Sequence, residues 1–343
     1  MSGRVLDVVQ IHQDSQEFRE FLTKRHISTS EVDQAIELIT QFDKYLAKPA
    51  NQATINEIHA FIQNNSGVKK DPERNLTYLY YYGKYVKSNP ITLASLELLD
   101  GGEVMDNFYK KLGEYIGNEL RDKIFHDIEC PSYGTAPLKK ARTMQVVMDR
   151  VEQLADPKTI VGLLDDCLRD LGEGSNAEER KRYEDTGDFD VFLEMKRQEY
   201  VQYLQGFADR GELYYTQEIT NEVVAFVRDN PEVAQGVRED NILYITKIPY
   251  MTKEYLAEDD EVKKRYYYCH CPWARESLKN GEKTVSATFC HCSAGFIKKP
   301  WEAIFGQKLE VDILESILQG DLRCRFAIHL PAQVLQAGEG EIR

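Results

Sequence analysis

The chain has 343 residues, of which 42% are hydrophobic and 29% are charged, so it has the size and composition of a globular protein with one large or two smaller domains. It has no apolar run near the roughly 20 residues that a membrane-spanning helix needs, and its first residues lack the pattern of a secretory signal, so we expect a cytoplasmic protein without membrane contact. The net charge of −14 falls mainly in residues 126–250, where 25 acidic side chains outnumber 15 basic ones, and this excess argues against nucleic acid as a partner.

The N-terminal part predicts a domain of short amphipathic helices. Ser28 and Glu31 have the spacing of a capping box, and Thr54 and Glu57 repeat it, so each pair marks a helix start. Apolar residues that recur on one face predict helices over 28–46, 54–67 and 72–86, with a weaker pattern to 99. We therefore expect residues 1–100 to form a helical docking or dimerisation domain, which would allow a homodimer.

The aromatic helix of this domain contains the run from Asn75 to Tyr85. Short capped helices followed by such a helix resemble the helical core-binding domain of tyrosine recombinases, which would imply DNA binding. The catalytic arginines, histidine and tyrosine that should follow in that family have no counterpart here. Because an aromatic stripe at helical spacing is usually core, the docking interpretation is preferred.

Gly101-Gly102 marks a joint between this domain and the next. Further helices are predicted over 104–125, 143–154, 159–171 and 191–204, and the acidic segment 172–190 is predicted to be a loop. The third of these helices carries Cys167, and a lone buried cysteine is most often a small core residue.

From Glu212 onward the apolar spacing changes to that of strands. Strands are predicted over 213–217, 242–248, 264–269, 284–290, 309–318 and 324–330, and helices over 220–229, 275–279 and 293–305. The last two strands should close an antiparallel layer. We therefore predict an α+β fold with an N-terminal helical domain, an α/β domain over 101–332 and a disordered tail over 333–343.

The most informative stretch runs from Tyr266 to Ile328 and holds five of the seven cysteines and two of the seven histidines. The triplet Cys-His-Cys occurs twice in it, at 269–271 and at 290–292. A repeat of this kind is hard to obtain by chance in a chain so poor in cysteine. In a reducing compartment, clustered cysteines are more often metal ligands or catalytic thiols than disulfides.

One interpretation of the repeat is a zinc site. Alternate side chains of a strand share a face, so Cys269 and Cys271 would point to one side and His270 to the other, and Cys290 and Cys292 would pair likewise. Two such edges brought together would offer thiolates to a tetrahedral zinc ion at about 2.3 Å. A one-residue gap between ligands needs a bend in the chain, because the usual zinc turn has two residues between its cysteines.

A second interpretation is nucleophilic catalysis by Cys290 or Cys292. Cys292 precedes Ser-Ala-Gly at a predicted helix start, where the helix dipole stabilises a thiolate. Because neighbours on a strand point apart, His291 would serve as the base for a thiol of the other segment. A third interpretation is that these cysteines are small buried residues that line a core or a pocket without chemistry.

The motifs Cys-His-Cys-Pro-Trp, Phe-Cys-His-Cys-Ser-Ala-Gly-Phe and Gly-Asp-Leu-Arg-Cys-Arg-Phe, in this order, resemble the L-2-amino-thiazoline-4-carboxylic acid hydrolase family. More distantly, they are similar to the 4-vinyl-reductase-type small-molecule-binding domains of bacterial aromatic sensors. These resemblances imply an antiparallel sheet and packed helices that enclose a pocket for a small molecule. We expect this pocket to be lined by Trp273, Phe296, Trp301, Glu315 and Cys324.

The resemblance to the sensor domains implies a zinc ion held by cysteines and a glutamate near the final motif. Cys324 matches one of these ligands, but Ser316 stands where a second cysteine is expected and Ile313 where the glutamate is expected. Glu315 is a substitute acid at this place. Any zinc would therefore use the Cys-His-Cys triplets.

These observations lead to two hypotheses from different classes. The first is a hydrolase that cleaves a C–N bond of a small cyclic or amide-like substrate, with a thiol or a bound zinc as its reactive centre. The second is a binding protein or sensor for a small aromatic or hydrophobic ligand, whose helical domain passes the signal to a partner. A structural zinc module without pocket chemistry is a further alternative.

Overall fold

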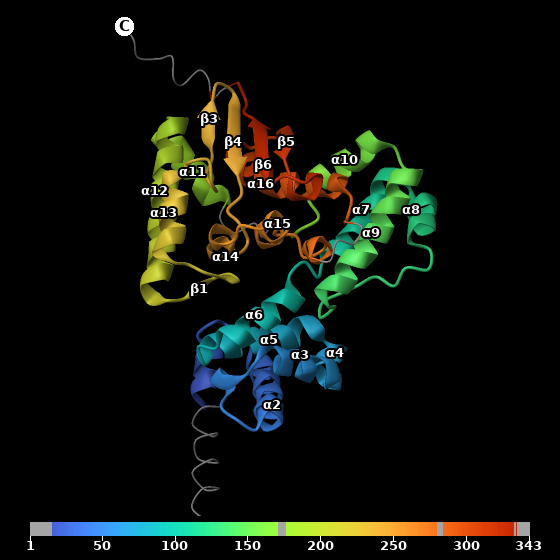
Figure 1. Cartoon of the computed structure of the whole chain (residues 1–343), viewed down its shortest axis with the longest axis vertical. Helices are drawn as coiled ribbons and strands as arrows, with labels where there is room; N and C mark the ends of the chain where they lie inside the picture. The colour runs from blue at the N-terminus through green and yellow to red at the C-terminus, as the bar shows by residue number, and fades with distance from the viewer. Residues whose placement is uncertain (1–15, 171–175, 280–283, 333, 335–343) are drawn as a thin grey trace, which may run out of the picture. The chain divides into compact units, whose positions relative to one another are not determined.

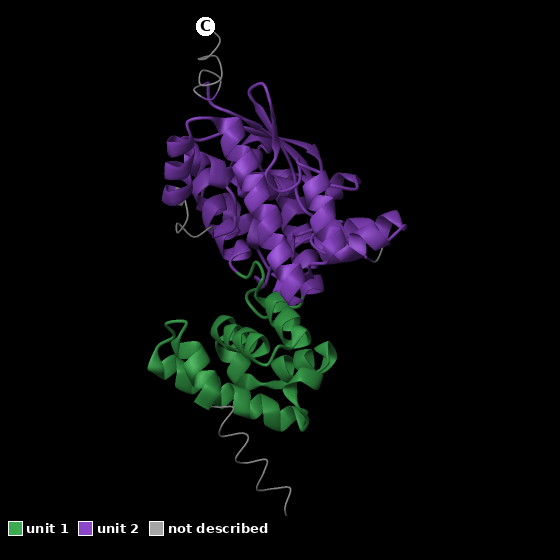
Figure 2. Cartoon of the chain, turned by 90° about the vertical axis from the view of Figure 1, so that its left-hand side faces the viewer, with its two compact units in different colours: residues 1–102, 132–136 green, residues 103–131, 137–343 purple. Residues whose placement is uncertain are grey.

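A computed structural model describes residues 16–170, 176–279, 284–332 and 334 of the chain. The chain divides into two compact units (Figure 2): unit 1 comprises residues 1–102 and 132–136, and unit 2 comprises 103–131 and 137–343. In the described segments unit 1 is helical, whereas unit 2 combines helices with small antiparallel sheets. The predicted α+β class with an N-terminal helical domain is therefore confirmed. Apart from Val334, the predicted tail lies outside the described residues.

Unit 1 is built from short helices with local caps. A helical segment over 16–23, which the sequence analysis did not predict, precedes α2. The named helices are α2 (Thr29–Leu46), α3 (Ile55–Asn64), α4 (Ser66–Lys70), α5 (Pro72–Tyr85) and α6 (Asn89–Leu99), with a 3₁₀ turn η1 (Ala50–Gln52). Both predicted capping boxes are present; at α3 the Thr54 amide donates to the Glu57 carboxylate at 2.8 Å, and the Glu57 amide donates to the Thr54 hydroxyl.

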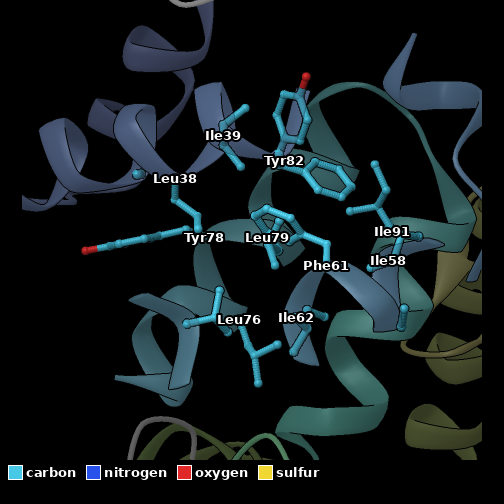
Figure 3. Packing of buried hydrophobic residues seen from close by; sticks show 14 of the residues in the cluster. Leu38, Ile39, Ile58, Phe61, Ile62, Leu76, Tyr78, Leu79, Tyr82 and Ile91 are labelled. Carbon is cyan, nitrogen blue, oxygen red and sulfur yellow. The ribbon is translucent and has the colours of Figure 1, made fainter. Parts of the chain in front are cut away.

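Figure 3 shows the core of unit 1, where apolar side chains from α2, α3, α5 and α6 meet. Leu79 of α5 is completely buried, and Tyr82 packs in the same core while its hydroxyl donates to Asp43 at 2.9 Å. The aromatic stripe of α5 is therefore core, as its spacing predicted. Gly83 allows α5 to touch α6, because a Cβ atom at this position would lie 2.7 Å from the Thr92 backbone nitrogen.

The segment 132–136 returns to unit 1 after the chain has already entered unit 2. The Gly134 amide donates to the carbonyl of Leu98 at 3.1 Å. The Tyr133 ring fills the space beside Gly102, where a Cβ atom would lie 2.2 Å from a ring carbon. Unit 1 is therefore completed by a second, separate piece of the chain.

Unit 2 carries the remaining helices and all the strands of the described segments (Figure 1). Its helices are α7 (Val104–Ile116), α8 (Asn118–Phe125), α9 (Pro137–Leu154), α10 (Pro157–Asp165), α11 (Asn176–Thr186), α12 (Phe189–Arg210), α13 (Asn221–Asp229), α14 (Thr252–Ala257), α15 (Glu261–Tyr268) and α16 (His291–Phe305). Its strands are β1 (Leu213–Tyr214), β2 (Gln217–Glu218), β3 (Val237–Glu239), β4 (Ile242–Thr246), β5 (Val311–Glu315) and β6 (Arg325–His329). Three 3₁₀ turns are η2 (Arg275–Leu278), η3 (Ala287–Cys290) and η4 (Ile317–Gln319).

The main sheet of unit 2 has four strands in the order β3-β4-β6-β5, and every neighbouring pair is antiparallel. The predicted pairing of the last two strands is thus confirmed. Phe326 and Ile328 of the central strand β6 are completely buried. They share a core with Trp301 and Ile304 of α16, so α16 packs against the sheet (Figure 1).

The segment 264–269, predicted as a strand, is helical instead. It lies in α15 and its C-cap, because the Asp260 carboxylate accepts a hydrogen bond from the Lys263 amide at 2.9 Å and so begins a helix. The tyrosines of this segment favour strands, but strand propensity depends on context and the local cap decides here. The alternation that placed Cys269 and Cys271 on one face of a strand is therefore wrong.

The segment 284–290, also predicted as a strand, ends in the η3 turn. The Ser286 hydroxyl accepts a hydrogen bond from the Thr288 amide at 3.2 Å, and this turn leads directly into α16. Cys290 and Cys292 are consequently separated by a helical step and not by a strand step. The strand geometry assumed for this second triplet is also wrong.

The acidic segment 172–190, predicted as a loop, contains the helix α11. The helix has little apolar periodicity, which is why its pattern gave no signal. Ion pairs four residues apart support it instead, between Arg180 and Glu184 at 3.0 Å and between Lys181 and Asp185 at 2.6 Å.

Several boundaries also differ from the prediction. The helix expected over 104–125 is divided at Gly117, whose φ of +84° is unfavourable for other residues. The strand expected over 213–217 is the β1–β2 hairpin, and α9 and α12 begin earlier than predicted. The helix α14 and the strand β3 were not predicted.

The helix α16 lies in direct backbone contact with the turn that follows α10. A Cβ atom at Gly295 would lie 2.6 Å from the Asp165 carbonyl oxygen and 2.8 Å from the Cys167 nitrogen. A side chain therefore cannot be added without moving one backbone from the other. This contact sets the distance between two cysteine-bearing segments that are far apart in the sequence.

We predict that Gly295→Ala destabilises the protein by about 1–3 kcal/mol, because the added methyl group overlaps backbone atoms that cannot move aside. Gly162→Ala is the matched control, since Gly162 lies in the neighbouring helix α10 with nothing within 4 Å of the added atom. The control change should stabilise the protein by about 0.5–1 kcal/mol. Urea denaturation measures both, and equal effects of the two changes would contradict the contact.

Candidate functional site

The two Cys-His-Cys triplets come together in unit 2, although they lie on turns and helix ends. Cys269 caps the C-terminus of α15, and Cys271 lies in the turn that follows it. Cys290 ends η3, and Cys292 lies in the first turn of α16. Cys290 lies near enough to Cys269, Cys271 and Cys324 for their thiolate charges to interact. Cys292 lies near enough to Cys271 for the same interaction. We call these five residues the thiol cluster.

Three thiols of this cluster are held in their protonated form mainly by burial. Burial is the first cause that raises the pKa of Cys269, of Cys290 and of Cys324, the last to about 12. Neighbouring thiols add to the effect at Cys290, because two negative charges would repel each other. At neutral pH these sulfurs are weak nucleophiles, since the thiolate is the reactive form.

The expected zinc site is not assembled by the residues as they are placed. Within residues 16–170, 176–279, 284–332 and 334, no three side chains of His, Cys, Asp or Glu lie close enough to hold a metal ion. The soft sulfur donors of the thiol cluster are of the kind that zinc prefers. Zinc at Cys269, His270, Cys271, Cys290 and Cys292 therefore stays a prediction from the sequence, which metal analysis of protein purified without chelators would test.

Cys167, interpreted above as an isolated core residue, lies beside Cys292. The side chains of Cys167 and Cys292 are hydrogen-bonded to each other, and this bond is the main cause that lowers the pKa of Cys167 to about 7. The same bond raises the pKa of Cys292, with burial as the second cause. The two residues are 4% and 8% exposed. We call them the dithiol pair.

A histidine and an aspartate adjoin the dithiol pair in the sequence. His291 Nδ1 lies 2.9 Å from an Asp165 carboxylate oxygen, so the end of α10 and the start of α16 are also joined by this polar contact. An aspartate in this position fixes the orientation of an imidazole ring. Within the described segments, His291 makes no hydrogen bond to a cysteine, so a direct Cys–His catalytic contact is not formed in this conformation.

Two cations of the same region have no carboxylate partner among the described residues. The Lys247 Nζ donates to the Ser293 hydroxyl at 2.9 Å and lies 5.4 Å from the centre of the Phe296 ring. Arg275 is only 6% exposed, and its guanidinium carbon lies 4.2 Å from the centre of the Tyr250 ring. In the described part of the chain, neither cation has a carboxylate within the 4.0 Å of an ion pair, and Arg275 Nε has no hydrogen-bond partner.

The positive charges of both cations act on His270, which is buried and neutral. Its Nε2 lies 2.6 Å from the Ile248 carbonyl oxygen, so Nε2 carries the proton and Nδ1 is the free acceptor. Burial, followed by the positive charge of Lys247, lowers the pKa of His270 to about 3, and the charge of Arg275 adds to this effect. We call Lys247, His270, Arg275 and Ser293 the cation site.

The residues expected to line a pocket lie in different surroundings. Trp273 is completely buried in a hydrophobic core, and Trp301 lies in the core between α16 and the sheet. Phe296 is 37% exposed beside Lys247, and Glu315 is paired with Arg323 at 2.6 Å. A surface cavity of about 340 Å³ lies at α12 and α13, and none of the predicted pocket residues lines it.

In the comparison with known families, the C-terminal part of the chain matches one family model. Residues 210–335 match DUF6144, a family of unknown function. This region contains the four-stranded sheet, the thiol cluster and the cation site, but the match covers less than half of the chain. No curated protein and no solved structure matches it. No helix in the described residues combines the length and the apolar character needed to cross a membrane.

The raised pKa values of the thiol cluster predict a distinct pH dependence of alkylation. In the folded protein, the iodoacetamide rates of Cys269, Cys290 and Cys324 should rise about tenfold per pH unit from about pH 7 to about pH 9, because the thiolate fraction grows in this way below the pKa. The rate of Cys167 should level off above about pH 8, since its pKa is lower. Peptide mass spectrometry measures each site, and an early plateau at Cys290 would contradict the prediction.

Proposed function

We propose that unit 2 binds a small molecule that carries a negatively charged group, such as a carboxylate, at the cation site. The observation that supports this proposal is the pair of cations, Lys247 and Arg275, that lie close to one histidine without a carboxylate partner in the described segments. Burial of an unpaired charge is costly, so buried cations are normally matched by an anion. The Tyr250 side chain offsets part of this cost at Arg275, but Arg275 Nε has no hydrogen-bond partner among the described residues.

The remaining groups of the cation site suit the same ligand. Ser293 lies in the first turn of α16, a helix of 15 residues whose N-terminus carries partial positive charge. The neutral His270 ring adds no charge of its own, and its Nδ1 accepts a hydrogen bond from a ligand N–H or O–H group. The exposed Phe296 ring next to Lys247 offers an apolar surface for the body of the molecule. A small cyclic carboxylate combines these features, and the resemblance to thiazoline-carboxylate hydrolases implies a substrate of this type.

Ligand-induced stabilisation would test this proposal with a panel of small cyclic carboxylates and their neutral carboxamides. A carboxylate that binds should stabilise the protein by about 2.7 kcal/mol at one hundred times its Kd, whereas its carboxamide should not. Arg275→Gln should weaken binding by about 1.5–3 kcal/mol, because it removes a charge-assisted hydrogen bond.

Arg323→Gln is the matched control, since Arg323 is paired with Glu315 and is largely exposed. It should leave carboxylate binding unchanged. The proposal fails if no carboxylate of the panel stabilises the wild type more than it stabilises a folded Arg275→Gln variant.

A C–N hydrolase is the second candidate function, and the contact between His291 and Asp165 beside the dithiol pair favours it. An imidazole oriented by a carboxylate next to a thiol of lowered pKa is an arrangement used in thiol catalysis. The arrangement points to Cys167, with Cys292 beside it, as the nucleophile in place of Cys290.

The hydrolase hypothesis predicts turnover of thiazoline-carboxylate or amide substrates and a covalent acyl adduct on Cys167. Cys167→Ala should abolish turnover, and His291→Gln should lower it by about a hundredfold or more, since general base catalysis contributes about that much. Cys130→Ala, which changes an exposed thiol far along the chain from the triplets, should not alter turnover. A zinc-replete, folded wild type that binds these carboxylates without turnover would leave only the binding function.

A further inference from the structure

The dithiol pair is held together by backbone contacts on both sulfurs. The amide of Leu168 donates to the Cys292 sulfur at 3.4 Å, and the next amide, of Arg169, donates to the Cys167 sulfur at 3.3 Å. Two consecutive peptide groups therefore fix the two sulfurs next to each other. Cys167 and Cys292 are far apart in the sequence, so the fold brings them together.

The segments that carry the two sulfurs cannot move apart easily. Gly295, one helical turn after Cys292, is in backbone contact with Asp165 and Cys167. The contact between His291 and Asp165 ties the same two segments together on the neighbouring residues. Sulfurs held within hydrogen-bond reach on rigid, adjoining backbone segments can be joined by a bond after a small side-chain rotation.

We propose that Cys167 and Cys292 form a redox-active pair that a small hydroperoxide oxidises to an intramolecular disulfide and that thiols reduce again. This site is distinct from the cation site and does not depend on the function proposed there. The low exposure of both sulfurs selects a small oxidant, such as hydrogen peroxide, over a bulky disulfide.

In the proposed reaction Cys167 is the attacking sulfur and Cys292 is the resolving sulfur. The Arg169 amide donates a hydrogen bond to the Cys167 sulfur at 3.3 Å and so stabilises negative charge on the sulfur that attacks the peroxide. The O–O bond breaks, Cys167 becomes a sulfenic acid and one water molecule leaves with the proton of the thiol. The Cys292 sulfur then attacks the Cys167 sulfur, the S–O bond breaks, and the hydroxyl leaves as water with the Cys292 proton. One peroxide is thus reduced to two water molecules, while two thiols are oxidised to one disulfide.

Peptide mapping of the full-length protein tests the proposal. The native protein is treated with hydrogen peroxide, its remaining thiols are blocked under denaturing conditions, and it is digested without reductant. We expect a cross-linked pair of peptides that contains Cys167 and Cys292, and its disappearance after treatment with dithiothreitol. In Cys292→Ala the sulfenic acid has no partner, so dimedone should label Cys167 in this variant but only weakly in the wild type.

The exposed Cys130 supplies the matched control, because Cys130→Ala should form the same cross-link as the wild type. The wild-type cross-link decides the question even if a variant of Cys167 or Cys292 fails to fold. A disulfide that joins Cys292 to Cys271, or Cys269 to Cys290, would overturn the proposal. So would a native protein in which Cys167 and Cys292 stay fully reduced at a peroxide concentration that oxidises Cys130.

Discussion

The contact between α16 and the turn after α10 is the constraint on which the candidate sites of unit 2 depend. It is made by backbone atoms at Gly295, Asp165 and Cys167, so side-chain repacking cannot loosen it. The same helix packs its other side against the sheet through Trp301 and Ile304. The start of α16, with its cysteine, serine and histidine, is therefore fixed relative to both the sheet and α10.

The two polar sites both adjoin this helix start and differ in chemistry. At the cation site, Lys247 and Arg275 supply positive charge and His270 stays neutral because it is buried next to them. At the dithiol pair, backbone amides stabilise sulfur. Ser293, which contacts Lys247, directly follows Cys292 in the chain. A new covalent bond at Cys292 would therefore also shift Ser293, whose hydroxyl accepts the hydrogen bond from the Lys247 ammonium.

The sequence predicted the parts of the structure that local chemistry determines. Capping boxes at Ser28 and Thr54 and the apolar face of α5 were enough to predict α2, α3 and α5 of unit 1. The last two strands were predicted because their alternation matches a half-buried sheet. The strand predicted over 264–269 was wrong. The tyrosines of this segment favour a strand, but the capping aspartate Asp260 starts a helix there.

The sequence predicted which stretch holds the candidate site, but it did not predict which cysteines lie next to each other. The repeated triplets identified the right stretch, since both lie in the thiol cluster, but the partner of Cys292 is Cys167, which has no local signal. Long-range pairs of this kind arise from helix packing, which a single sequence does not encode as a motif. The burial of Arg275 could have been predicted. It follows the apolar and small residues Pro-Trp-Ala, and burial of these neighbours implies burial of the arginine.

The return of residues 132–136 to unit 1 has a consequence for the order of synthesis. The amide of Gly134 and the ring of Tyr133 complete a unit whose other residues end at Gly102. Residues 103–131, which belong to unit 2, must therefore leave the ribosome before unit 1 can be finished. During translation, the position beside Gly102 that the Tyr133 ring fills stays open until this excursion of the chain has closed.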